Sequence, residues 1–193
     1  GAAAGHDASL APSAFLRIDP SGTVTITVAR SDMGQGVRTA LPMIVAEELE
    51  VPLDRVEVFH AVASPAFQQF GLQMTGGSTS ASDSFRPIRE GAASAREMFI
   101  SAAAAQWACP RGECEVAQGV ITHAPSGRTL RYGELTQAAA KQEIPGEVTL
   151  KTRDAFRVIG TDATRVDMRQ KIDGSAVFGL DVSLENMARA VVV

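Results

Sequence analysis

The sequence has 193 residues, and its 18 lysines and arginines against 22 aspartates and glutamates give a formal net charge of −4. A hydrophobic content of 45% and a mean hydropathy of +0.04 exclude disorder as the main description, because a chain of this length and composition can bury a sizeable core. An isoelectric point of 5.4 argues against nucleic acid as a partner, since neutralising phosphates needs clustered positive charge. Two cysteines are too few for a disulfide framework or a four-cysteine iron–sulfur site, and no structural zinc site is expected.

The first predicted elements are a hairpin and a helix. Residues 14–29 predict a β-hairpin, because polar and apolar side chains alternate over 23–28 and Asp19–Gly22 is typical of a turn. The spacing of apolar residues then predicts a helix over 39–50. The acidic residues of this helix are expected to be solvated charges on its outer face: Glu47, Glu48 and Glu50.

The remaining elements are expected to be a strand over 55–60, a long loop over 61–82, a long helix over 83–107, a small hairpin over 112–130 turned at 125–127, and a short helix over 132–141. Together they predict an α+β fold, a sheet with helices packed on one face. The apolar run 188–193 is typical of a strand. It is expected either to pair outside this chain or continue beyond it, or to form a short edge strand of the same domain.

The first segment that could carry chemistry is Asp32–Gly36, between a predicted strand and a predicted helix. Two glycines let a ligand approach the backbone, and the helix start that follows offers unpaired N–H groups. A tight turn without a ligand is the alternative interpretation. The segment is not the dinucleotide-binding fingerprint, because the third glycine is missing and the predicted sheet is not a βαβ series.

The second segment, Thr75–Ser82, places glycines and hydroxyl groups directly before the long helix. Backbone N–H groups, hydroxyls and a helix start together suit a phosphate or pyrophosphate. The lysine of a Walker loop is absent, so ATP hydrolysis is not indicated. Helix caps followed by a flexible linker are the alternative, but two such segments in one small chain favour a single shared polyphosphate ligand.

Residues 30–43, 46–49 and 74–80 resemble the molybdenum-cofactor-binding subunit of the xanthine dehydrogenase family. The similarity covers nearly the whole chain and is strongest to the branch of isoquinoline 1-oxidoreductase β subunits and periplasmic aldehyde dehydrogenase large subunits. Residues 171–181 resemble the opening of that family's α/β hammerhead domain. The resemblance therefore implies part of a cofactor-binding domain over 10–165 and the beginning of a hammerhead domain over 166–193.

The resemblance implies molybdopterin cytosine dinucleotide, carrying molybdenum, as cofactor. The Gly-Gln-Gly loop of the family lies against the pterin and its phosphate, which assigns that role to Gly34, Gln35 and Gly36. The serine-rich loop of the family holds the cofactor's phosphates, and the cofactor-binding residues expected here are Thr75, Gly76, Gly77, Ser78, Thr79 and Ser80. No catalytic residue is expected in this chain, because the family's catalytic glutamate lies far towards the C-terminus of the full-length subunit. No metal ligand is expected in this chain either.

The resemblance further implies the N-terminal part, or a processed chain, of a molybdenum hydroxylase large subunit that is inactive alone. The expected partners are the remainder of that subunit, a [2Fe–2S] subunit and, in the periplasmic branch, a cytochrome c carrying haem c. The expected substrate is an aldehyde or an N-heteroaromatic compound, and the expected location is the periplasm, although no export signal is visible. The rival hypothesis is a non-catalytic module that binds a phosphorylated ligand or assists assembly through a partner chain.

Three further groups of residues are not expected to carry the function. Cys109 and Cys114 form neither a haem nor a Cys-x-x-Cys motif, and whether they are free or bonded depends on geometry. The three histidines are far apart in sequence and are not expected to bind a metal: His6, His60 and His123. The arginines near the start of the long helix are expected to form a solvated face, with phosphate neutralisation as the alternative: Arg86, Arg89 and Arg96.

Overall fold

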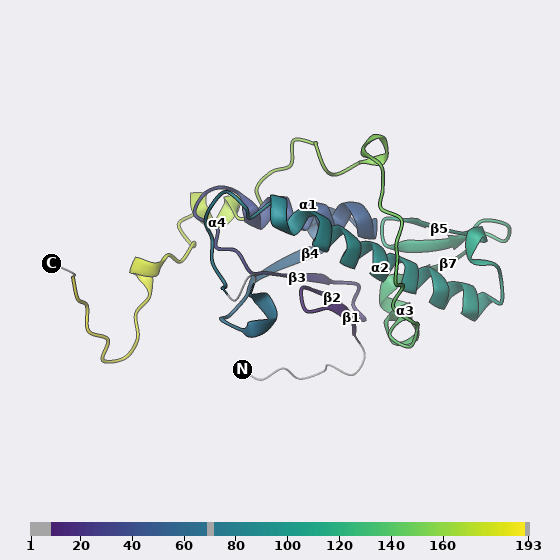
Figure 1. The fold of residues 1–193 in the computed structure, drawn as a ribbon, viewed down its shortest axis with the longest axis horizontal. Coiled ribbons are helices and arrows are strands. Elements are labelled where there is room, and N and C mark those ends of the chain that lie inside the picture. The colour runs from purple at the N-terminus through teal and green to yellow at the C-terminus, as the bar shows by residue number, and fades with distance from the viewer. Residues whose placement is uncertain (1–8, 69–71, 192–193) are drawn as a thin grey trace.

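The computed structural model describes residues 9–68 and 72–191 (Figure 1). The strands of a four-stranded sheet are β1 (Leu10–Ser13), β2 (Leu16–Ile18), β3 (Val24–Val28) and β4 (Val56–His60), in that order across the sheet. A three-stranded sheet contains β5 (Cys114–Ala117), β6 (Val120–His123) and β7 (Arg128–Arg131). The helices are α1 (Val37–Leu49), α2 (Ser82–Trp107), α3 (Tyr132–Ala139) and α4 (Met168–Ile172). This arrangement confirms the predicted α+β fold class.

The first sheet combines the predicted hairpin with one parallel crossover. β2 and β3 are antiparallel, with Leu16 opposite Ile26, and the turn between them is the predicted one. β3 and β4 are parallel, with Ile26 opposite Val58, and α1 connects them. The sheet is therefore not a βαβ series, but it contains one βαβ unit, because a parallel pair needs a crossover and α1 is long enough to provide it.

The hydrophobic core lies between the first sheet and the two long helices, which lie side by side over it (Figure 1). Alanines on α2 let the two helices approach closely, since Ala92, Ala95 and Ala103 are fully buried. The ring of Phe99 stacks on that of Tyr132 with centroids 4.1 Å apart. This contact fixes α3 against α2 and continues the core towards the second sheet.

The second sheet has one more strand than the sequence predicted. The additional turn lies at Gln118 and Gly119, whose φ angles of 53° and 72° are both left-handed. A two-residue hairpin turn of this kind requires positive φ at both positions, and glutamine gives a weaker signal for it than asparagine does. The predicted turn at 125–127 correctly separates β6 from β7.

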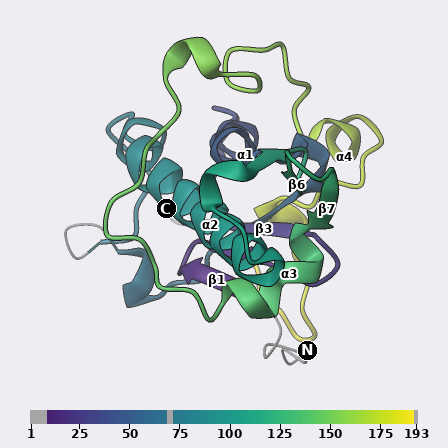
Figure 2. The same ribbon diagram turned by 90° about the vertical axis from the view of Figure 1, so that its right-hand side faces the viewer.

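The acidic residues of α1 are not solvated charges, so that expectation was wrong. Glu47 is 1% exposed and Glu48 is fully buried, while Glu50 is partly buried and pairs with Lys151. The cause is an extended stretch between α3 and α4, residues 149–159, here called the covering segment. In Figures 1 and 2 the chain between α3 and α4 runs over the outer sides of α2 and α1.

Buried carboxylates attach the covering segment to α1. Glu47 accepts hydrogen bonds from the backbone N–H groups of Arg157, Val158 and Ile159 at 2.9, 2.7 and 3.0 Å. Lys151 Nζ adds an ion pair to the same carboxylate at 3.1 Å. Burial raises the pKa of the Glu47 carboxyl, but these hydrogen bonds outweigh burial and hold the pKa below its ordinary value.

Glu48 makes a second buried network, with two arginines of α2. Arg89 Nη2 lies 2.6 Å and Arg96 Nη1 3.4 Å from the Glu48 carboxylate oxygens. Arg96 also donates to the carbonyl oxygen of Thr149 in the covering segment. The expectation of a solvated arginine face was therefore wrong for Arg89 and Arg96, whereas Arg86 is exposed and pairs with Glu90 on the surface.

The described residues of the C-terminal run, 188–191, form no strand with the rest of this chain, so the edge-strand alternative was wrong for them, while pairing outside this chain stays a prediction; 192–193 lie outside the described residues. His6 also lies outside them. Among the helices that the structure describes, none combines the length and apolarity needed to cross a membrane. The division of the chain between residues 165 and 166 stays a prediction.

Replacing Glu47 with glutamine is expected to lower the free energy of unfolding by about 3 kcal/mol at pH 7, because three buried N–H groups and Lys151 lose their anionic acceptor. The folded-state pKa is depressed. The carboxylate's contribution is therefore complete above the unfolded-state pKa of about 4.3 and is lost as pH falls through the folded-state pKa. Urea unfolding between pH 7 and pH 3 checks both points.

The exposed Glu115 provides the control, since Glu115→Gln is expected to change the free energy of unfolding by less than about 0.5 kcal/mol. An E47Q curve that runs parallel to that of the wild type over the whole pH range would show that the Glu47 network contributes no pH-dependent stability.

Candidate functional site

The first predicted segment, Asp32–Gly36, forms a tight loop organised by a carboxylate. The Asp32 side chain accepts hydrogen bonds from the N–H groups of Gly34 at 2.8 Å and Arg38 at 3.0 Å. Burial raises the pKa of Asp32, but these N–H groups and Arg165 outweigh burial and keep the pKa below its usual value. Gly34 and Gly36 adopt φ angles of 105° and 85°, which residues with a Cβ rarely reach.

The amide of Gln35 folds back onto its own loop. Its Oε1 accepts from the N–H of Met33 at 2.6 Å, and its Nε2 donates to the carbonyl oxygen of Ser31 at 2.8 Å. These two bonds, together with those of Asp32, hold the backbone between β3 and α1 in one shape. The conformation of the loop therefore depends on its own side chains.

The part of the second predicted segment that is expected to bind the cofactor, Thr75–Ser80, is joined directly to the first segment. The N–H of Ser31 donates to Thr75 Oγ1 at 2.8 Å, between residues that lie 44 positions apart. Arg30, which is 7% exposed, donates to the carbonyl oxygen of Met74 and pairs with Asp83 at 3.5 Å. Arg30 thus connects the end of β3 to the second segment and to the first turn of α2.

The two segments line one cavity of about 450 Å³. Its lining residues are Met33, Gln35, Val37, Ala40, Thr75, Gly76, Gly77, Ser78, Ser80 and Ala81. Six of the nine residues predicted to bind the cofactor are in this lining, whereas Gly34, Gly36 and Thr79 are not. Gly34 lines a neighbouring cavity with Asp32 and Arg38, and Thr79 Oγ1 donates to the carbonyl oxygen of Gly76 within its own segment.

The cavity offers neutral hydrogen-bond donors. In the part of the chain that the structure describes, the N–H groups of Gly77 and Ser78 and the hydroxyls of Ser78 and Ser80 have no hydrogen-bond partner. Gly77 and Ser78 also have left-handed φ angles of 61° and 59°. Successive N–H groups beside a helix start are suited to a phosphate oxygen, and the absence of a Cβ at Gly77 allows close approach of a ligand.

Contacts from Arg165 and Val166, here called the clamp, hold the first segment in place, and the sequence did not predict them. Arg165 Nη1 donates to the carbonyl oxygen of Gly34 at 3.1 Å, and its Nη2 lies 3.6 Å from Asp32. The same guanidinium makes two hydrogen bonds to Asp167, and these lower the pKa of that carboxyl. The N–H of Val166 donates to Thr39 Oγ1 on α1. No local sequence pattern indicates this clamp, because its partners lie more than 120 positions apart.

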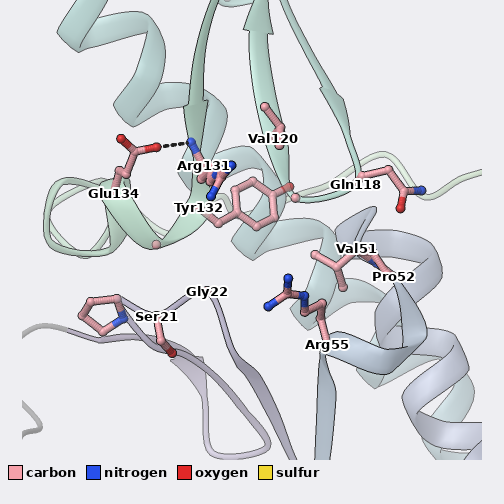
Figure 3. A pocket seen from close by; sticks show the side chains of 13 residues that line it. Ser21, Gly22, Val51, Pro52, Arg55, Gln118, Val120, Arg131, Tyr132 and Glu134 are labelled. Carbon is pink, nitrogen blue, oxygen red and sulfur yellow. Dashed lines mark hydrogen bonds between the residues drawn. The ribbon is translucent and has the colours of Figure 1, made fainter.

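A different cavity, of about 570 Å³, lies between the turn of the first hairpin and the start of α3 (Figure 3). Arg55 and Arg131 contribute to its wall, and Glu134 accepts from the N–H of Arg131 at 2.8 Å. The N-terminus of α3 packs tightly here, since a Cβ on Gly133 would lie 2.3 Å from the carbonyl oxygen of Pro20. None of the residues predicted to bind a cofactor lines this cavity.

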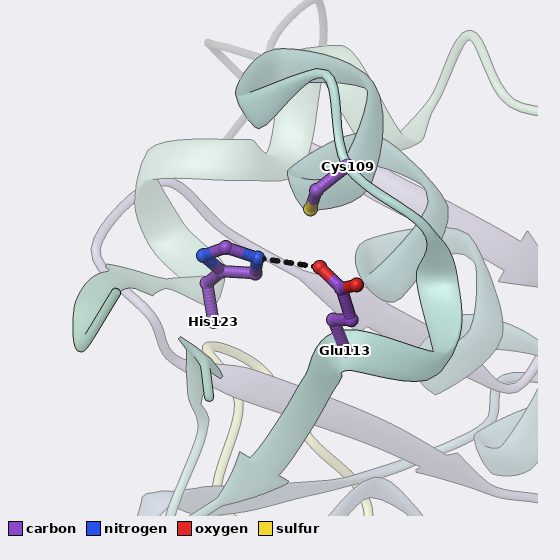
Figure 4. Close-up of side chains that lie close together, drawn as sticks. All are labelled: Cys109, Glu113 and His123. Carbon is purple, nitrogen blue, oxygen red and sulfur yellow. Dashed lines mark hydrogen bonds and ion pairs between the residues drawn. The ribbon is translucent and has the colours of Figure 1, made fainter. Parts of the chain in front are cut away.

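The histidines are far apart in sequence, but the fold brings one of them, His123, close to other potential metal ligands. The structure places His123 beside Cys109 and Glu113 (Figure 4). Cys109 and Cys114 are free thiols whose sulfurs are 3.9 Å apart. The contacts arise from the register of the second sheet and the turn after α2, which sequence spacing does not reveal.

Comparison with known families gives a match over residues 1–184 to the molybdopterin cofactor-binding domain. The chain belongs to this family. The match confirms the resemblance to the molybdenum-cofactor-binding branch of the xanthine dehydrogenase family that residues 30–43 and 74–80 indicated.

Two curated relatives are 32% identical to this chain. One is the isoquinoline 1-oxidoreductase β subunit of Brevundimonas diminuta, matched over 96% of this chain and 28% of the relative. The other is a nicotinate dehydrogenase subunit of Pseudomonas putida, matched over 93% of this chain and 15% of the relative. The chain therefore spans less than a third of the length of either relative.

A solved structure of CO dehydrogenase from Oligotropha carboxidovorans has a TM-score of 0.53 to this chain at 23% identity. The match covers 64% of this chain and 15% of that one, and it supports the fold described above.

Replacing Arg165 with glutamine is expected to loosen the first segment, because Gly34 and Asp32 both lose a charged partner. Amide hydrogen exchange at residues 32–38 should accelerate several-fold, while the unfolding midpoint changes little. Arg169→Gln is the matched control, since Arg169 is almost fully exposed and makes only a long contact with Asp173. Equal exchange in the two variants would contradict the clamp.

Proposed function

We propose that this chain is part of the large subunit of a molybdenum hydroxylase and that it binds molybdopterin cytosine dinucleotide. The observation that carries the proposal is a cavity of about 450 Å³ that is lined by residues of both predicted segments, which belong to different parts of the sequence. Membership of the molybdopterin cofactor-binding family supplies the identity of the ligand class.

The donor set of the cavity fits the phosphate portion of such a cofactor. Thr75, Gly76, Gly77, Ser78 and Ser80 supply a stretch of backbone and small hydroxyl side chains to the lining. The unpartnered N–H groups described above bind phosphate oxygens in this proposal, and Thr79 supports the segment from within.

In this proposal, the first segment contacts the pterin part of the cofactor. Gln35 lines the cavity, and the positive φ angles of Gly34 and Gly36 keep the loop compact. When bound, the cofactor supplies the redox centre of the reaction. The residues of this chain bind and orient it, and the glutamate that acts as base lies outside this chain, which is inactive alone.

The substrate class rests on the relatives. Their names indicate oxidation of N-heteroaromatic compounds, and a membrane-bound aldehyde dehydrogenase of Gluconacetobacter polyoxogenes is 27% identical over 94% of this chain and 24% of its own length. We therefore propose an aldehyde or an N-heteroaromatic substrate, a [2Fe–2S] partner subunit that accepts the electrons, and a cytochrome c after it. We also propose a periplasmic location, which is the location expected for the branch of the family that this chain resembles.

The proposal is tested on the native complex with every chain that copurifies, by elemental analysis and by nucleotide release in acid. Molybdenum and CMP are each expected near one per complex. Gly77→Val is expected to lower both at least tenfold, because the side chain enters the cavity lining. Gly127→Val is the matched control, since Gly127 also has a positive φ, of 69°, but lies in the turn between β6 and β7.

An intact wild-type assembly that contains neither molybdenum nor CMP would overturn the enzyme proposal and leave a non-catalytic binding module. Equal losses in G77V and G127V would show that backbone strain, and not the position in the cavity, caused the loss.

A further inference from the structure

A second cluster of potential ligands lies where the end of α2 meets the second sheet. Cys109 follows the last turn of α2, Glu113 immediately precedes β5, and His123 ends β6. Figure 4 shows the three side chains converging on one point. One ligand atom from each lies within 4.8 Å of the other two. None of them lines the cavity assigned to the cofactor.

Cys114 lies beside the cluster, although it is not one of the three residues whose ligand atoms lie within 4.8 Å of one another. Its sulfur is 3.9 Å from that of Cys109, and its Cα pairs with that of His123 across β5 and β6. Residues directly opposite each other in a sheet direct their side chains to the same face, and both of these side chains are buried. Cys114 therefore lies on the side of the sheet that carries His123.

The spacing of the donor atoms suits a tetrahedral metal ion. Bonds of about 2.3 Å to sulfur and about 2.0 Å to nitrogen or oxygen place neighbouring ligand atoms of tetrahedral zinc roughly 3.3–3.8 Å apart. The sulfurs here are 3.9 Å apart, and His123 Nε2 lies 2.9 Å from Glu113 Oε2. Cys109, Glu113 and His123 are therefore close to the spacing of zinc ligands, and a rotation of the Cys114 side chain is needed to bring its sulfur in as the fourth.

The imidazole of His123 is held in an orientation that suits a ligand. Its Nδ1 lies 2.6 Å from Ser126 Oγ, and Nε2 faces Glu113. When Nδ1–H donates to the serine hydroxyl, Nε2 presents its lone pair, which is the arrangement that outer hydrogen bonds impose on zinc-binding histidines. Without a metal, the other tautomer satisfies these contacts, with Nε2–H donating to Glu113 and Nδ1 accepting from Ser126 or from Arg128.

The surrounding charges favour a dication with anionic ligands. Two thiolates, one carboxylate and Zn²⁺ sum to a net charge of −1, and Arg128 Nη2 lies 3.4 Å from His123 Nδ1. Zinc binds thiolates and neutral imidazole, so binding releases protons and the affinity should rise with pH.

We propose that Cys109, Cys114, Glu113 and His123 form a zinc site that fastens the end of α2 to the second sheet. Four protein ligands leave no open coordination position, so the ion has a structural role. The proposal departs from the expectation that this chain contains no metal ligand, and it does not depend on the cofactor assignment.

The test uses the complete protein with all copurifying chains, reduced and stripped with a chelator and then titrated with Zn²⁺. Elemental analysis should find one more zinc ion per complex in the wild type than in His123→Asn. Zinc should also protect both cysteines from alkylation, read on the peptide that contains them. Binding should tighten as pH rises from 6 to 8. His60→Asn is the matched control, because His60 is exposed and outside the cluster.

Glu113→Gln provides a second variant that keeps the test decisive if His123→Asn fails to fold, because the Glu113 side chain is 42% exposed. Its zinc affinity should fall at least tenfold while the molybdenum and CMP contents stay unchanged. Equal zinc in the wild type and both variants would overturn the proposal. So would alkylation that zinc does not slow, or a peptide lighter by two hydrogens, which would reveal a disulfide in place of the metal site.

Discussion

The burial of two adjacent glutamates on α1 is the constraint on which much of this structure depends. A carboxylate removed from water is stable only when charged or N–H partners replace its hydration, and Glu47 and Glu48 draw those partners from separate elements. Glu47 binds the backbone of the covering segment, residues 149–159, while Glu48 binds Arg89 and Arg96 of α2. The helix α1 is thereby held on its outer side by these polar contacts and on its inner side by the hydrophobic core.

This fixation determines where the candidate site lies. The first segment directly precedes α1, and the second directly precedes α2, so the packing of the two helices sets the distance between the segments. Arg30 and Arg165 then restrain the loops individually, one from the end of β3 and one from the start of the segment that leads to α4. Sites held by rigid helices and supporting hydrogen bonds keep their geometry better than free loops do.

Local features were predictable from the sequence, and long-range ones were not. The alternation over 23–28 located β3, and the periodicity of 39–50 and 83–107 located α1 and α2 to within two residues at each boundary, because such patterns reflect a single buried face. The burial of Glu47 was missed because residues 149–159 show no periodic pattern of apolar residues that would predict their packing over α1. His123 was missed as a neighbour of Cys109 because strand register, not spacing, brings them together.

The charge distribution around the cavity is consistent with the choice of ligand proposed above. No lysine or arginine is among its lining residues, yet Arg30 and Arg38 belong to the loop and helix that form one side of it. A Walker-type site places a lysine directly on the terminal phosphates, where charge is most concentrated. Two phosphates within a dinucleotide carry less charge, and backbone N–H groups, with arginine charges set behind them, suffice for such a group. A lining of neutral donors is therefore consistent with the pyrophosphate of the proposed dinucleotide cofactor.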